Sequence, residues 1–412
     1  MTRDALDTTL EAVKQLDMLL EESVEEARRR ESKTFEEMVG DRSARIVLFG
    51  AGGLGRRTLA GLRSVGVTPL AFSDNRRDLW GRMVDGIEVL SPEDAARQFG
   101  VSAAFVVTIW GAGSVHRFAD SVNQLNLLGC DVVVPASWLS WRYAETLLPF
   151  YAMELPSKLL EHASEVRTVF GFLSDDRSRR EYVTQVQWRL TGDPSCLSHP
   201  VADPQYLVAE VVSELTDDVV LDCGAYDGDT LRSWIESRGS SFIRYYALEP
   251  DPSNRRLLEK YIADLRPDLA ERVKVFPYAV TNFTGTARFD VTGLPSSSFG
   301  DGQGIPVECV RLDDLEMELE GLEPTFVKAD IEGAELELIQ GGLDILGRSH
   351  PVIAIAAYHR QDHLWKVPLA IKSLWSEYRL LLRPHNEEGW DLVLYAVPPK
   401  RDPTGQLSAV GP

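Results

Sequence analysis

The stretch Val219–Thr230, with the sequence VVLDCGAYDGDT, decides the fold of the C-terminal half of this chain. A short apolar run ends near Asp222, turns through Gly224 and enters a polar segment near Gly228. An apolar strand, a glycine turn and a helix in this order are typical of a parallel α/β sheet. Such sheets bind small molecules beyond the carboxyl ends of their strands, and glycine lets the backbone approach a ligand closely. The stretch therefore predicts a ligand-binding turn.

Further apolar runs follow at intervals that leave room for helices. After Val219–Cys223 the candidate strands are Tyr245–Glu249, Val273–Pro277, Thr325–Asp330, Val352–Ala357, Tyr378–Leu382 and Leu392–Val397. The segment between the last two is too short for a crossover helix, so we expect them to form an antiparallel hairpin. Residues 216–400 are thus predicted to form a Rossmann-like α/β domain with an antiparallel last strand. The segment Thr286–Arg311 lies between the third and the fourth candidate strand and is rich in glycine and serine. We interpret it as a long loop or lid.

The charges around the glycine turn indicate the kind of ligand. Asp222, Asp227 and Asp229 surround it, and so many carboxylates would repel a pyrophosphate but attract a sulfonium that carries an ammonium group. This favours S-adenosylmethionine over a dinucleotide. Glu249, at the end of the second strand, can accept hydrogen bonds from ribose hydroxyls in either kind of site. The end of the third strand, with Ala279, is expected to face the adenine ring.

Candidate catalytic groups follow the fourth and fifth strands. Asp330 ends the fourth strand and is expected to project into the same cleft as Asp222. Glu335 is expected in the first turn of the next helix, where a carboxylate suits the helix dipole. His359 lies just beyond the fifth strand, where a histidine can act as a general base near neutral pH. A hydrogen-bonded surface histidine is the alternative for His359 and the preferred interpretation for His363.

The N-terminal half contains a second set of α/β signals. Residues 1–40 are predicted to form one amphipathic helix, packed on its own domain or forming the seam of a homodimer. Residues 41–137 are predicted to form a smaller Rossmann-type domain, because the apolar run Arg45–Phe49 leads into the glycine turn Gly50–Gly55 and Asp74 ends the next strand. This turn is compatible with an NAD site, a recognition module for a nucleotide sugar or the acceptor, or a purely packing role. Residues 138–215 are interpreted as a helical connector.

Composition excludes several classes of function. The chain has 412 residues, with 63 acidic and 43 basic side chains and a formal net charge of −20. Such a surface repels nucleic acid and anionic membranes, so we expect neither as a partner. Four scattered cysteines form no C-x-x-C pair, which argues against a zinc cluster and for a reduced environment. The sequence shows no apolar run of membrane-spanning length and no signal peptide, so we expect a cytoplasmic protein.

The motifs together resemble the FkbM family of methyltransferases. The resemblance covers residues 203–397 and rests on Leu221–Thr230, the pair Glu249-Pro250 and the segment Lys328–Glu335, with Gln205-Tyr206 as a further family feature. It implies a Rossmann-like methyltransferase sheet and methyl transfer from S-adenosylmethionine, mostly to hydroxyl oxygens of natural products and sugars. It also implies an active-site role for Asp330 and Glu332. The implied donor-binding residues are Asp222, Gly224, Tyr226, Asp227 and Glu249. We add Ala225 and Pro250, which lie next to them in the same motifs, and Ala279 at the end of the third strand.

Methyl transfer is an in-line displacement, so the enzyme mainly aligns the acceptor oxygen, the methyl group and the sulfur. A base assists an alcohol nucleophile, and either Asp330 or His359 can serve. We expect no metal, although Asp330 and Glu332 could instead hold a divalent ion that acidifies the hydroxyl. Two other functions remain open from the sequence: an NAD-dependent oxidoreductase that uses the N-terminal glycine turn, and a non-catalytic nucleotide-binding module.

Overall fold

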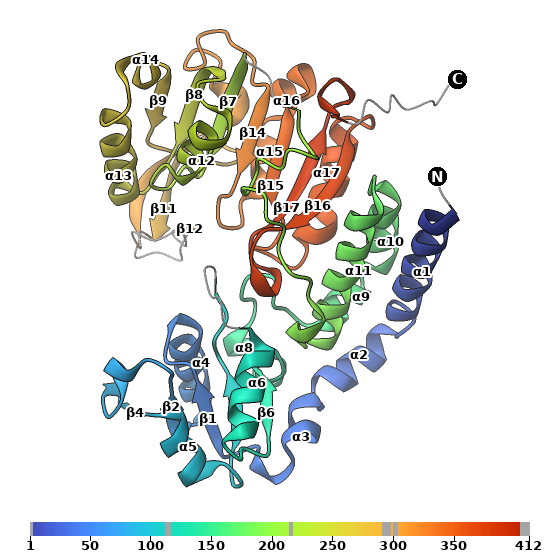
Figure 1. Ribbon diagram of the computed structural model, residues 1–412, viewed down its shortest axis with the longest axis vertical. Helices are drawn as coiled ribbons and strands as arrows, with labels where there is room; N and C mark the ends of the chain where they lie inside the picture. Colours follow the sequence, from blue (N-terminus) through green and yellow to red (C-terminus); the bar gives the residue numbers. More distant parts are fainter. Residues whose placement is uncertain (1–2, 112–116, 214–216, 291–297, 300–303, 404–412) are drawn as a thin grey trace. The chain divides into compact units, whose positions relative to one another are not determined.

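The computed structural model describes residues 3–111, 117–213, 217–290, 298–299 and 304–403 (Figure 1). The chain forms two compact units, which we treat separately. The first unit comprises Met1–Arg167, Arg180–Pro200 and Asn386–Trp390. The second unit comprises Thr168–Arg179, Val201–His385 and Asp391–Pro412. The predicted connector, residues 138–215, is divided between the two units, and the domain limits drawn from the sequence stay predictions.

A seven-stranded sheet forms the centre of the second unit, with the order β16-β17-β15-β14-β7-β8-β9. The strands are β7 (Asp218–Cys223), β8 (Phe242–Leu248), β9 (Val273–Phe276), β14 (Phe326–Ala329), β15 (Val352–Ala356), β16 (Arg379–Pro384) and β17 (Leu392–Val397). β17 runs antiparallel to both β15 and β16, whereas β7, β8, β9, β14 and β15 pair in parallel. The predicted α/β sheet with an antiparallel last strand is therefore confirmed.

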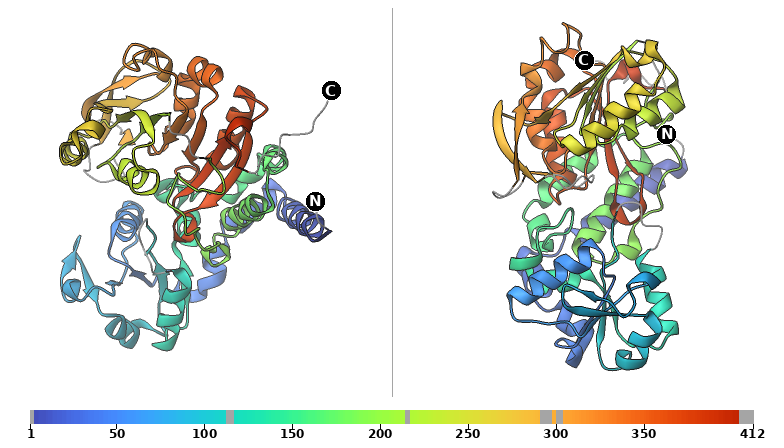
Figure 2. Two further views of the ribbon diagram at one scale, coloured as in Figure 1. Left: turned by 45° about the horizontal axis from the view of Figure 1, so that its top comes forward. Right: turned by 90° about the vertical axis from the view of Figure 1, so that its left-hand side faces the viewer.

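Helices cover both faces of this sheet. They are α12 (Asp229–Arg238), α13 (Pro252–Ala263), α14 (Pro267–Ala270), α15 (Glu335–Gly341), α16 (Leu343–Ser349) and α17 (His363–Leu374). Figure 2 shows α12 and α13 on one face and α15, α16 and α17 on the other, as expected because right-handed crossovers that run in opposite directions along a sheet place their helices on opposite faces. Since both faces are covered, β7, β14 and β15 are buried along their whole length, which explains their continuous apolar sequences.

A smaller four-stranded sheet follows β9. Its order is β10-β13-β11-β12, with β10 (Tyr278–Val280), β11 (Gly285–Asp290), β12 (Ser298–Phe299) and β13 (Ile305–Val310). The interpretation of Thr286–Arg311 as a loop is therefore wrong at both ends, because β11 and β13 form an antiparallel pair. Val307 and Cys309 alternate along β13 and bury their side chains, a period-two pattern that predicts a strand. Most of the glycine- and serine-rich stretch lies outside the described residues.

The first unit contains a six-stranded sheet with the order β3-β4-β2-β1-β5-β6. Its strands are β1 (Ile46–Phe49), β2 (Ala71–Ser73), β3 (Met83–Val84), β4 (Ile87–Leu90), β5 (Ala104–Val107) and β6 (Val133–Pro135). Only the edge pair β3–β4 is antiparallel among these strands. The helices α4 (Gly53–Ser64), α5 (Pro92–Phe99) and α6 (Phe118–Leu127) connect them, so this unit too has a Rossmann-type arrangement.

The single helix predicted for residues 1–40 is wrong. The segment forms three helices, α1 (Arg3–Leu19), α2 (Val24–Glu31) and α3 (Thr34–Val39). The first break has a local cause, because Ser23 and Glu26 form a reciprocal capping box that starts a new helix at Val24. The apolar spacing continued across this break and concealed it.

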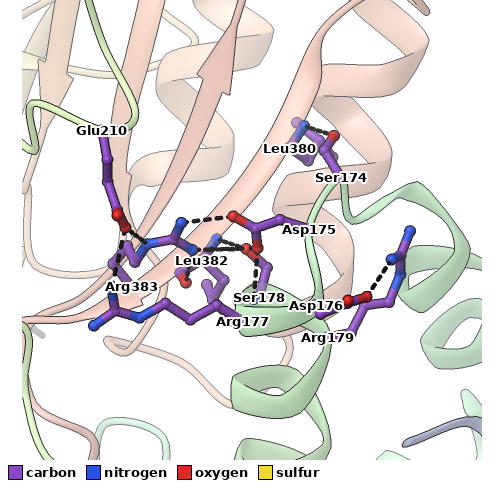
Figure 3. Close-up of polar contacts among 10 residues, drawn as sticks. All are labelled: Ser174, Asp175, Asp176, Arg177, Ser178, Arg179, Glu210, Leu380, Leu382 and Arg383. Atoms are coloured by element: carbon purple, nitrogen blue, oxygen red, sulfur yellow. Dashed lines mark hydrogen bonds and ion pairs between the residues drawn. The ribbon is translucent and has the colours of Figure 1, made fainter. Parts of the chain in front are cut away.

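Five more helices occupy most of residues 136–191. They are α7 (Ala136–Arg142), α8 (Ala144–Leu147), α9 (Pro156–Leu160), α10 (Ala163–Phe172) and α11 (Asp176–Thr191). The turn between α10 and α11 lies along the edge strand β16 in the second unit, where Ser174 N–H donates to Leu380 O at 2.9 Å. Leu380 N–H donates to Ser174 Oγ at 3.1 Å, and Leu382 N–H donates to Ser178 Oγ at 2.9 Å (Figure 3). These bonds occupy the free edge of β16, which would otherwise be open to pairing with another chain.

Among the described residues, no helix combines the length and the apolar character that crossing a membrane requires.

Candidate active site

Lys328 lies at the centre of the charged residues at the carboxyl ends of β7 and β14. It pairs in register with Asp222, and its Nζ lies 3.1 Å from Asp222 Oδ1. Lys328 Nζ also donates to Gly224 O, and Tyr245 donates its hydroxyl hydrogen to Asp222 Oδ2 at 2.7 Å. Burial opposes the charge of Lys328, but the surrounding carboxylates, Asp222 first among them, hold the pKa of this lysine above its usual value.

This arrangement gives Asp222 a buried partner, and its part in donor binding stays a prediction. Its side chain is 0% exposed and its charge is balanced by Lys328, so Asp222 stabilises the glycine turn. The sequence contained a signal for this pair. Lys328 is the one charged residue in the buried strand Phe326–Ala329, and lysines are almost never fully buried unless they are paired.

Gly224 is required by a close approach of two strand ends. Its φ is +80°, and a Cβ atom at this position would lie 1.9 Å from the carbonyl oxygen of Asp330. From the sequence, we expected this glycine to allow the close approach of a ligand. In the structure, the group that leaves no room for a side chain is the backbone carbonyl of Asp330, directly after β14. The turn of β7 and Asp330 are thus held in direct contact.

Glu249 joins the same turn to the end of β8. Its Oε2 accepts the N–H of Tyr226 at 2.8 Å, and its Oε1 accepts the N–H of Asp251 at 2.8 Å. Burial raises the pKa of Glu249 to about 7, although both hydrogen bonds act in the opposite direction. The glycine turn after β7 and the end of β8 therefore lie side by side, and the buried carboxyl group of Glu249 joins them.

The remaining predicted donor-binding residues lie in different surroundings and differ in burial. Ala225 is fully buried beneath the turn and Pro250 is partly buried beside Glu249. Asp227 is partly exposed, with Arg232 Nη1 4.0 Å from its Oδ1. Ala279 lies in β10 of the small sheet, where its side chain packs with Val307 and Cys309. The third strand of the main sheet ends three residues earlier, at Phe276, so Ala279 does not lie at the tip of that sheet.

The predicted catalytic residues do come together. Tyr206 donates its hydroxyl hydrogen to Asp330 Oδ2 at 2.6 Å. His359 Nε2 lies 3.2 Å from Asp330 Oδ1 and 3.8 Å from Glu332 Oε2. Asp330 and Glu332 remain partly exposed, whereas the His359 side chain is 1% exposed. One imidazole therefore faces both carboxylates that the sequence indicated.

Glu335 holds the other side of this histidine. His359 Nδ1 lies 2.7 Å from Glu335 Oε1, and His363 Nδ1 lies 3.2 Å from Glu335 Oε2. Burial works against the charges of Glu335 and His359, yet their mutual attraction lowers the pKa of Glu335 to about 2 and raises that of His359 to about 10. The interpretation of His363 as a surface residue is wrong, because its side chain is fully buried and burial lowers its pKa to about 4.

The same groups are the candidate ligands for a cation. Asp330, Glu335 and His359 offer ligand atoms that lie within 4.8 Å of one another. Each of these atoms already faces a partner of opposite charge within the group. The expectation that no metal takes part stays a prediction.

In the first unit, Asp74 engages the N-terminal glycine turn directly. Its Oδ2 accepts the N–H of Ala51 at 2.7 Å, and its Oδ1 accepts the N–H of Arg76 at 2.8 Å. Gly55 is required by packing, because a Cβ atom there would lie 2.0 Å from Gly50 O. Both features stabilise the turn itself, and a nucleotide site in this unit stays a prediction.

Comparisons with known proteins concern the domain and the fold. Residues 222–388 match the model of the methyltransferase FkbM domain. No curated protein matches the sequence. The fold is similar to the crystal structure of methyltransferase FkbM from Methylobacillus flagellatus KT, with a TM-score of 0.73 and 21% identity over 95% of this chain and 100% of that chain. The match to the methyltransferase FkbM domain thus spans the glycine turn, Asp330 and His359.

Proposed function

We propose that this protein transfers a methyl group from S-adenosylmethionine to a hydroxyl oxygen of a natural product or sugar. The observation that carries the proposal is the contact between the glycine turn and Asp330. The backbone carbonyl of Asp330 packs against Gly224. The carboxylate of the same residue has two defined partners, Tyr206 and His359. A donor bound at the turn would place its methyl group near this carboxylate.

Several groups at the turn fit an adenosine-bearing cation. Each oxygen of Glu249 accepts one backbone hydrogen bond, and a carboxylate oxygen can accept a second one, here from a ribose hydroxyl. The partly exposed Asp227 offers a carboxylate to the ammonium group. The donor supplies the electrophilic methyl carbon, and the residues of this chain bind, orient and exclude water around it.

Asp330 is the better candidate for the base. His359 faces carboxylates through both ring nitrogens, and its pKa is raised to about 10, so it already carries its proton at neutral pH. A protonated imidazole cannot accept the hydrogen of an alcohol. Asp330 can accept it, with His359 and Tyr206 holding its two oxygens in place.

Isothermal calorimetry with S-adenosylmethionine, S-adenosylhomocysteine and NAD⁺ tests the donor site. We expect saturable binding of the first two, weakened by Glu249→Leu but not by Glu259→Leu, a change at an exposed carboxylate on α13. Release of S-adenosylhomocysteine with a panel of glycosides and polyols then tests the acceptor class. Saturable binding of NAD⁺ without any response to S-adenosylmethionine would support the oxidoreductase alternative.

A further inference from the structure

Glu335 is the first residue of α15, and its carboxylate is completely buried between three segments of the chain. Its Oε1 accepts the N–H of Ile331 at 3.0 Å and lies 2.7 Å from His359 Nδ1. The N–H of Gly333 is 3.5 Å from the same oxygen, and His363 Nδ1 is 3.2 Å from Oε2. One side chain thus connects the turn after β14, the segment after β15 and the start of α17.

The first of these contacts controls the turn that carries the acids. Between Asp330 and α15, Glu332 has a φ of +54° and Gly333 a φ of +106°. A left-handed conformation is unfavourable for glutamate and persists only where the surroundings hold it. By accepting the N–H of Ile331, Glu335 stabilises the turn in the conformation that directs Glu332 and Asp330 to His359.

The second contact controls the imidazole. An N–H···O separation of 2.7 Å is in the range of charge-assisted hydrogen bonds. With Nδ1 committed to Glu335, His359 directs Nε2 to Asp330 at 3.2 Å and to Glu332 at 3.8 Å. A carboxylate that only caps α15 would need the backbone N–H of Ile331 but no imidazole. In enzymes and metal sites, a buried acceptor on one ring nitrogen sets the tautomer and the orientation of the other.

We propose that Glu335 is a positioning residue that fixes the His359 ring with Nε2 against Asp330 and Glu332. Because the Glu335 side chain is 0% exposed, it is not placed to contact a donor or an acceptor itself. Its effect on methyl transfer rests on the proposed function, whereas its contact with His359 can be tested without any turnover.

Proton NMR of the full-length protein labelled with ¹⁵N-histidine tests the contact directly. We expect one Nδ1–H resonance far downfield, as a short bond to a carboxylate produces, and His359→Gln should remove it. Glu335→Gln keeps the size and the acceptor oxygen but removes the charge, and it should shift this resonance upfield or broaden it beyond detection. Glu337→Gln on the same helix is the matched control, and His363→Asn removes only the second histidine. Both should leave the resonance in place.

Binding and kinetics then separate positioning from stability. We expect Glu335→Gln to bind S-adenosylhomocysteine with an affinity close to that of the wild type and, with an acceptor from the panel, to lower kcat by about 10- to 100-fold, the usual effect of removing an outer carboxylate from a histidine. Glu335→Asp should recover part of kcat because the charge returns. A matching loss of donor affinity would assign Glu335 a structural role only.

The spectra of the wild type and of the His359→Gln and Glu335→Gln variants can overturn the proposal without any turnover. If no downfield resonance is lost in His359→Gln, or if the resonance survives Glu335→Gln, His359 is not held by Glu335. If the resonance behaves as expected but neither S-adenosylmethionine nor S-adenosylhomocysteine binds, the proposed function fails and the contact between Glu335 and His359 stands.

Discussion

Lys328 and Asp222 form a buried ion pair across two neighbouring strands, with 3.1 Å between Nζ and Oδ1. The pair lies beneath the turn that is expected to hold the methyl donor, and Lys328 also binds the carbonyl oxygen of Gly224. A buried charge that loses its partner is strongly destabilising, whereas an exposed pair contributes little. The pair therefore links the stability of the second unit to the conformation of the glycine turn.

Lys328→Met should leave Asp222 buried without its counter-charge and lower the free energy of unfolding of the second unit by about 3–5 kcal/mol. Lys274→Met is the matched control, because Lys274 pairs with Glu320 on the surface and its loss should change stability little. Urea denaturation followed by tryptophan fluorescence gives both values. Equal effects of the two changes would contradict the coupling of Lys328 to Asp222.

Asp330→Asn should reduce turnover by roughly 10²–10⁴-fold, the range expected for the loss of a general base. The amide keeps an oxygen for the Tyr206 hydroxyl but cannot take up the proton of the acceptor. Donor binding should change little, since the proposed role of Asp330 is to accept the proton of the acceptor. Calorimetry with S-adenosylhomocysteine beside initial rates decides this, and a parallel loss of affinity and turnover would count against Asp330 as the base.

Gly224→Ala should disrupt the glycine turn, because the Cβ atom of the alanine would lie 1.9 Å from Asp330 O. Gly239→Ala is a close control, as Gly239 also has a positive φ, +63°, but has no atom within 4 Å of the added Cβ. We expect about 1 kcal/mol of destabilisation from the left-handed backbone at Gly239 and a clearly larger loss at Gly224. Thermal unfolding compares them, and similar losses at both positions would show that the close approach relaxes without cost.

Arg383 should be essential for the attachment of the α10–α11 turn to β16. Its guanidinium is buried, with Nη2 2.6 Å from Asp175 Oδ2 and Nε 3.1 Å from Glu210 Oε1 (Figure 3). Arg383→Met removes the shared partner of two carboxylates that stay partly exposed to solvent, so we expect a loss of about 1–3 kcal/mol. Arg177→Met, which removes an exposed partner of Glu210, should have a small effect. Limited proteolysis between α10 and α11 provides a local readout, and unchanged cleavage in Arg383→Met would refute the role.

Glu388 should make the stability of the first unit depend on pH. Burial raises its pKa to about 7, partly opposed by the hydrogen bond from the N–H of Phe118. In the unfolded chain a glutamate releases its proton near pH 4.3. The folded state therefore binds the extra proton between these values, and its stability falls as the pH rises from about 4.5 to about 7.

Glu388→Gln should remove this dependence. The variant should gain on the order of 2 kcal/mol over the wild type between pH 5 and pH 8, because one pKa unit corresponds to about 1.4 kcal/mol. Thermal unfolding at the two pH values measures the change, and the other titrating groups cancel in the difference between variant and wild type. A constant difference across this range would mean that Glu388 is ionised in the folded protein at pH 5.

Local patterns in the sequence predicted the fold of the main sheet well, because its central strands β7, β14 and β15 are buried on both faces and read as apolar runs. The hairpin at the C-terminus followed from a connection too short for a helix. The small sheet escaped prediction because β11 and β13 are separated by a stretch rich in glycine and serine, and their pairing is a long-range contact. One helix was predicted for residues 1–40 because the helical spacing of apolar residues continues through Ser23, which caps the start of α2.

By itself, the sequence determined that acids and a glycine turn meet at one edge of a parallel sheet, since the carboxyl ends of parallel strands share an edge. Only the tertiary structure decided how each of these acids is partnered and how far it is exposed. Asp222 is neutralised by Lys328, Glu335 is committed to His359 and His363, and Asp330 stays partly exposed between Tyr206 and His359. The physical reason is that burial and partner choice depend on side chains from distant strands and loops, whose approach no local pattern specifies.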